Sequence, residues 1–111
     1  MKVLSPTLKE RKRYILFKIH SDNTLKKETI AKQCTDACLR FLGEFGCADA
    51  GVQFLPETWD SKTKTGIIRT GHKWVDKTKA ALTLIKEIEG KPATVSTILT
   101  SGSLNKLKEK R

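Results

Sequence analysis

The most pronounced chemical feature of this sequence is its excess of positively charged residues. The chain carries 22 Lys and Arg against 12 Asp and Glu, a net charge of +10 at pH 7. Such an excess favours a polyanionic partner, because each phosphate that a cation neutralises releases bound counterions. We predict that ten cations, clustered near both ends of the chain and around residue 65, contact nucleic-acid phosphates: Lys9, Arg11, Lys12, Arg13, Lys62, Lys64, Arg69, Lys106, Lys108 and Arg111.

Side chains that could perform catalysis are few and scattered. His20 and His72 could each act as a general base, but the first ends a predicted strand and the second begins a predicted helix. The sequence contains no glycine-rich phosphate-binding motif. We therefore expect two surface histidines and no catalytic residue in this chain.

Three cysteines, Cys34, Cys38 and Cys47, are an odd number that argues against a disulfide framework. Cys34 and Cys38 stand four residues apart in a predicted helix, where small core residues are expected. A zinc site would need a fourth ligand, and the two histidines lie in other predicted elements. We expect no metal bound by the protein.

Hydrophobic periodicity predicts alternating strands and helices. Alternation marks the strands, and apolar spacings of three and four mark the helices. Gly90 and Pro92 are expected to stop the second helix, and Pro56 to mark an edge strand or a break. The expected strands are 13–20, 50–60, 65–70 and 93–100, and the expected helices are 24–45, 72–90 and 104–111.

This order, β-α-β-β-α-β, predicts a ferredoxin-like α+β fold: a four-stranded antiparallel sheet with two helices on one face. We expect a single domain over residues 1–111, with a basic arm (1–12), the folded core (13–100) and a basic C-terminal helix or tail (101–111).

The second face of the predicted sheet is expected to be open. RNA-recognition motifs share this topology and stack bases on aromatic residues of the two central strands. Here the third strand, "TGIIRT", has no aromatic residue, and the first offers only Tyr14 on that face. We therefore expect contacts to RNA backbone or structured RNA, and we take Tyr14, Leu16 and Ile67 as candidate contacts to a protein partner.

No apolar run approaches the roughly 20 residues that a membrane span needs. The N-terminus "MKVLSPTLKERKR" also lacks the apolar region of a secretory signal. We expect a cytoplasmic protein without a membrane partner.

Three stretches resemble the archaeal ribonuclease P protein component 2 family, which is related to a small subunit shared by eukaryotic ribonuclease P and its MRP relative. They are "LSPTLKERKRYILFKI" (4–19), "TKTGIIRT" (63–70) and "TSGSLNKLKEK" (100–110), and they occur in the family's order. The similarity is good over about residues 4–20 and 62–110, and holds mainly as a pattern across 21–60.

The resemblance implies an accessory protein of a ribozyme that removes 5′ leaders from precursor tRNA. The RNA, with bound Mg²⁺, would perform the endonucleolytic hydrolysis, and the protein itself would bind no cofactor. Implied partners are the ribonuclease P RNA, precursor tRNA, ribonuclease P protein component 3 and other ribonuclease P proteins, with self-association of the heterodimers.

Two other classes of function remain open at this point. A stand-alone RNA-binding module would bind unrelated RNAs with comparable affinity and would gain nothing from component 3. A protein-interaction adaptor would use its charge for solubility, and would bind its partner independently of salt.

Overall fold

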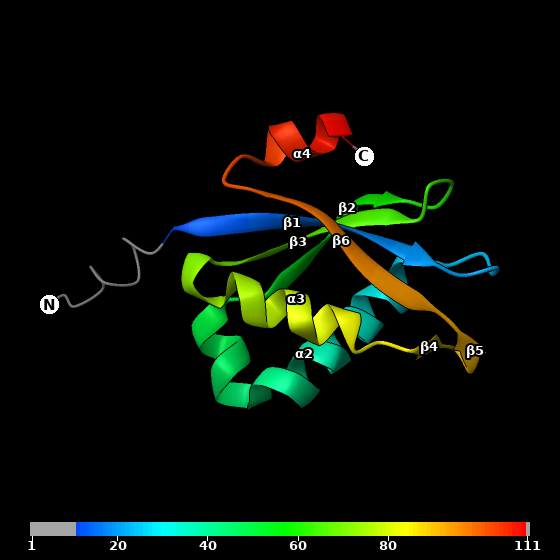
Figure 1. Ribbon diagram of the computed structural model, residues 1–111, viewed down its shortest axis with the longest axis horizontal. Coiled ribbons are helices and arrows are strands. Elements are labelled where there is room, and N and C mark those ends of the chain that lie inside the picture. Colours follow the sequence, from blue (N-terminus) through cyan, green and yellow to red (C-terminus); the bar gives the residue numbers. More distant parts are fainter. Residues whose placement is uncertain (1–10, 111) are drawn as a thin grey trace, which may run out of the picture.

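A four-stranded antiparallel sheet organises the chain, which the computed structural model describes over residues 11–110 (Figure 1). The strands lie in the order β2-β3-β1-β6. They span Lys12–His20 (β1), Gln53–Asp60 (β2), Thr65–Gly71 (β3) and Thr94–Ser101 (β6). β1 and β3 are central, and β2, which contains Pro56, is an edge strand as predicted.

Helices cover one face of this sheet (Figure 1). They are α2 (Lys27–Ala50) and α3 (Val75–Thr83), which follows a short 3-10 turn, η1 (His72–Trp74). Ile15, Phe17 and Ile19 alternate along β1 and are buried beneath the helices. The ferredoxin-like fold predicted from the sequence is therefore confirmed.

The predicted end of the first helix, at residue 45, is wrong. Gly43 breaks the helical path, with φ 77° and ψ 172°, yet the helix continues to Ala50. It ends at Gly51, a left-handed residue whose N–H donates to the carbonyl oxygen of Cys47. The sequence pattern had placed Phe41 and Phe45 in the core, but around this kink they are 46% and 93% exposed.

The predicted second helix is too long. α3 ends at Thr83, and β4 (Glu87–Ile88) and β5 (Lys91–Pro92) form a small hairpin. Its two turn residues, Glu89 and Gly90, have φ of 54° and 77°, as a tight hairpin turn requires. Ile85 and Ile88 are buried as predicted, but they reach the core from outside a helix.

The far face of the sheet, opposite α2 and α3, was predicted to be open, but the structure shows that a helix covers part of it. Helix α4 (Leu104–Lys110) lies across it (Figure 1). Leu107 is fully buried against Leu16, Leu55 and Ile67, which stand side by side on β1, β2 and β3. Leu16 and Ile67 are 0% exposed because α4 covers them, so the prediction that they contact a protein partner is wrong.

Two local devices fix the sheet at β3. A Cβ at Gly66 would lie 3.1 Å from ring atoms of Phe17, Phe54 and Trp59, so any other residue would force these aromatic rings to shift. Where β2 departs from regular pairing, the buried hydroxyl of Thr58 accepts a hydrogen bond of 3.0 Å from the Ile67 N–H. The edge strand thus stays attached despite its irregularity.

Within residues 11–110, no helix is both long and apolar enough to cross a membrane.

We predict that Leu107→Ala lowers the free energy of unfolding by about 2–3 kcal/mol, because it removes the buried side chain that seals Leu16 and Ile67. Urea denaturation monitored by circular dichroism measures this change. Asn105→Ala, at an exposed position of the same helix, is the control. Equal stability of the two variants would show that α4 contributes little to the cover of the far face.

Candidate nucleic-acid interface

One group of predicted cations lies at the end of the sheet where β1 begins. Lys12 pairs with Gly71, and Tyr14 pairs with Arg69, so Lys12 and Arg69 are neighbours on the far face. Arg11 extends this group: it is exposed, and its carbonyl oxygen accepts a 2.8 Å hydrogen bond from the His72 N–H.

Two arginines of this group are partly engaged by the protein itself. Arg69 donates to the side-chain oxygen of Gln53, and its buried Nε has no hydrogen-bond partner within residues 11–110. Arg13 donates to the carbonyl oxygen of Lys12 at 3.2 Å and lies against Gly102. Arg13 thus links the start of β1 to the turn that leads into α4.

Two lysines of α4 point away from the sheet. Lys106 and Lys108 are exposed, because Leu104 and Leu107 take the inward positions of the helix. Since α4 follows the turn that Arg13 contacts, the structure brings the cations at the start of β1 close to the beginning of this basic helix. Lys9 and Arg111 lie outside the described residues.

Lys62 and Lys64 occupy the opposite end of the sheet. They lie in the β2–β3 turn, where the Lys64 carbonyl oxygen accepts a 2.9 Å bond from the Ile19 N–H. Lys12 and Ile19 are seven residues apart on β1, about 23 Å at the usual rise of a strand. The predicted cations therefore form two groups rather than one.

The two lysines of this turn differ in availability. Lys62 is exposed, and its N–H donates to a carboxylate oxygen of Asp60 at 2.9 Å in a tight Asp turn. Lys64 is half-buried with a positive φ of 58°, and its ammonium group donates to the Ser21 carbonyl oxygen. Lys64 stabilises the loop after β1, which leaves Lys62 as the more available cation.

The far face also carries a pair of hydrogen-bonded polar side chains that was not predicted from the sequence. A 2.7 Å hydrogen bond joins the ring nitrogen Nε2 of His20 on β1 to the hydroxyl of Ser96 on β6, although the two residues are 76 positions apart in the sequence. Lys18, on the same face, pairs directly with Ser96 in the strand register. Strand alternation over residues 13–20 does place Lys18 and His20 on one face, but it cannot identify their neighbour on β6.

The thiols are not activated as nucleophiles. Burial, reinforced by Cys38, raises the pKa of Cys34 well above its usual value. Burial, reinforced by Cys47, raises the pKa of Cys38 to about 11. Both thiols are therefore protonated at neutral pH. Within residues 11–110, no three His, Cys, Asp or Glu side chains gather as a metal ion would require.

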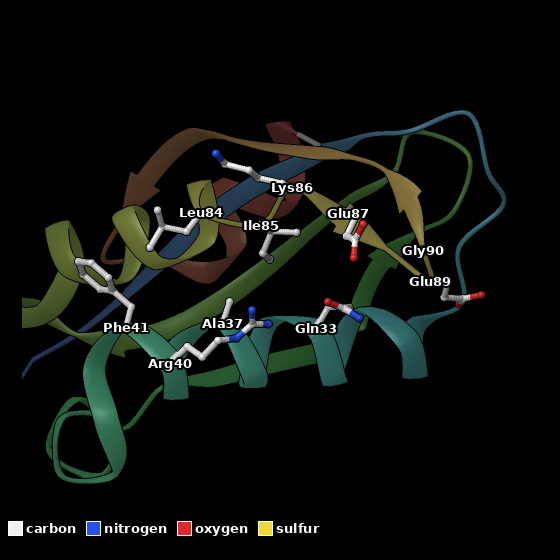
Figure 2. A pocket seen from close by; sticks show the side chains of 10 residues that line it. All are labelled: Gln33, Ala37, Arg40, Phe41, Leu84, Ile85, Lys86, Glu87, Glu89 and Gly90. Atoms are coloured by element: carbon white, nitrogen blue, oxygen red, sulfur yellow. The ribbon is translucent and has the colours of Figure 1, made fainter.

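A groove of about 660 Å³ opens on the helix side, between α2 and the segment that follows α3 (Figure 2). Phe41 and Leu84 face each other at one end of it and are 46% and 55% exposed. Its charged lining consists of two cations and two anions: Arg40, Lys86, Glu87 and Glu89. The groove thus lacks the positive excess of the chain as a whole.

Comparisons with known proteins give a consistent result. The profile of the Rpp14/Pop5 family matches residues 13–111. Ribonuclease P protein component 2 of Pyrococcus furiosus is 40% identical over 109 residues, which cover 98% of this chain and 89% of that protein. The component 2 protein of Methanocaldococcus jannaschii is 36% identical over 110 residues, covering 99% of this chain and 79% of that protein.

Among solved structures, a chain in the cryo-EM structure of yeast ribonuclease MRP has the same fold. It superposes with a TM-score of 0.65 at 23% sequence identity, and the match covers 86% of this chain and 76% of the yeast chain.

Proposed function

This chain belongs to the Rpp14/Pop5 family, and from that premise we propose that it is an accessory protein subunit of ribonuclease P, acting in the removal of 5′ leaders from precursor tRNA. The observation that carries the proposal is the similarity, over almost the whole chain, to archaeal proteins named ribonuclease P protein component 2. A stand-alone RNA-binding module is not favoured, because these relatives carry the name of a subunit.

In this proposal the RNA component hydrolyses the phosphodiester bond with its own Mg²⁺, and this chain supplies fixed cations. Arg11, Lys12 and Arg13, together with Lys106 on α4, contact RNA phosphates. Positive charge placed there screens the repulsion between the catalytic RNA and its precursor-tRNA substrate. Less Mg²⁺ is then needed to reach the same degree of screening.

Cleavage of precursor tRNA by an archaeal ribonuclease P RNA tests this role. The RNA is titrated with Mg²⁺ alone, with this chain, with component 3, and with both proteins. We expect the pair to shift cleavage to lower Mg²⁺ concentrations or to raise the rate. If the RNA responds to a known pair of subunits but not to this chain with component 3, the proposed function is wrong.

The double variant Lys12→Ala and Arg13→Ala should raise the Mg²⁺ concentration required for half-maximal cleavage, because it removes two cations from the proposed RNA contact. Lys26→Ala with Lys32→Ala removes the same charge from exposed positions near and on α2, and should leave the requirement unchanged. A thermal melt of each variant controls for folding. The same requirement in both double variants would contradict a local role of Lys12 and Arg13.

The helix-side groove is our candidate surface for a protein subunit, with component 3 as the occupant that the family resemblance implies. Phe41 and Leu84 offer exposed apolar area at one end, and aromatic anchors dominate the energetics of many protein interfaces. The balanced charges of the lining also suit a protein better than a polyanion. By contrast, the basic groups described above lie at the ends of the sheet and on α4.

Replacing Phe41 and Leu84 together by Ser should weaken binding of component 3 by about tenfold or more, because two apolar contacts are lost. Isothermal titration calorimetry with purified component 3 measures the affinity. Leu39→Ser, at a position of α2 that is 42% exposed and outside the groove lining, is the matched control. An unchanged affinity in the double variant would place component 3 elsewhere.

A further inference from the structure

Helix α4 covers only part of the far face, and a polar area remains beside it. In Figure 1, β1 and the β2–β3 hairpin extend beyond the end of α4. Lys18 and His20 stand two and four residues after the covered Leu16, so they share its face of β1. Both are exposed, as is Ser96 of the neighbouring strand β6.

The strand register gathers these side chains into one small area. Lys18 pairs with Thr65 on one side and with Ser96 on the other. Thr65 is buried and its hydroxyl is bonded to that of Thr63, so the exposed hydroxyl beside Lys18 is that of Ser96. His20 comes next along β1, and its Nε2 is 2.7 Å from the Ser96 hydroxyl oxygen. This bond orients the imidazole ring and engages one ring nitrogen, so the second can still bind a ligand.

Cations outnumber acids in this area. The far-face positions of β1, β3 and β6, read from the register, include no carboxylate, and Asp60 of the edge strand β2, which pairs with Thr65, accepts hydrogen bonds from the N–H groups of Lys62 and Thr63. Lys62 adds an exposed cation from the adjoining β2–β3 turn. An ammonium group, an imidazole and a hydroxyl on β1 and β6, separated from Asp60 by β3, are a combination that contacts phosphate oxygens and ribose hydroxyls.

We propose that Lys18, His20 and Ser96 form a second RNA-contact surface, which binds backbone phosphates apart from those bound by Arg11, Lys12 and Arg13. The proposed function supplies the identity of the polyanion as RNA. Lys12 and Lys18 are six residues apart on β1, about 20 Å, so the two groups contact different phosphates. Readout of stacked bases is not part of this surface, since Tyr14 lies beside α4 at the other end.

The test is equilibrium binding of the full chain to ribonuclease P RNA over a series of salt concentrations. Lys18→Ala should weaken binding and lower the slope of log affinity against log salt by about 1, the effect of losing one phosphate contact. Lys18→Arg keeps the charge and should keep the slope. Lys32→Ala removes an exposed lysine from α2 and should leave the slope unchanged.

A second measurement locates the phosphates. In phosphate-ethylation interference, ethylating a contacted RNA phosphate weakens binding of the wild-type chain. We expect one set of phosphates whose ethylation no longer weakens binding of the Lys18→Ala variant, and a different set whose ethylation no longer weakens binding of the Lys12→Ala, Arg13→Ala variant. Ser96→Ala removes the hydrogen bond that orients the His20 ring, so it should reduce the ethylation interference at the first set of phosphates. Ser96→Thr keeps the hydroxyl and should preserve the interference. Overlap of the two sets would overturn the proposal of a separate surface.

The two proposals fail in different ways. If the wild-type chain neither binds nor activates the RNA, the proposed function fails and the surface loses its ligand. If the wild-type chain activates the RNA but Lys18→Ala matches Lys32→Ala in slope and affinity, the second surface alone is wrong. Unchanged thermal melts of the exposed-site variants exclude misfolding as the cause.

Discussion

Three consecutive residues of β1, Ile15, Leu16 and Phe17, are each fully buried, and a strand can bury consecutive side chains only if both faces of its sheet are covered. Helices α2 and α3 cover Ile15 and Phe17, and α4 covers Leu16. Charge is therefore excluded from the middle of β1. It returns at Lys12 and Arg13 before the buried segment and at Lys18 after it, which is why the cations on this strand fall into separate groups.

Much of this architecture could be predicted from the sequence, because alternation and helical spacing are local signals. The alternation of Ile15, Phe17 and Ile19 correctly predicted that they share one face of the strand. The spacing of Ile85 and Ile88 correctly predicted their burial but not their conformation, since a hairpin can bury the same two side chains. The kink at Gly43 was equally ambiguous: a glycine permits a helix end, a kink or an uninterrupted helix, and packing with the rest of the chain decides among them.

The candidate site was predictable in kind and not in arrangement. Net charge indicated a polyanion, but the distance between Lys12 and Lys62 depends on strand register, which no local pattern contains. The groove on the helix side was hidden for a related reason. Phe41 matches a core position by helical spacing, yet the path of the chain around it leaves this ring partly in solvent.

The placement of Leu107 also has a consequence for how the protein is made. A ribosome delivers Leu16 long before Leu107, because β1 comes first and α4 last among the described elements. Until α4 emerges, Leu16, Leu55 and Ile67 form an apolar strip that remains uncovered on the far face of the sheet. The nascent chain therefore passes through a period in which a chaperone or a second nascent chain can occupy the place of α4, and slow translation near its codons prolongs that exposure.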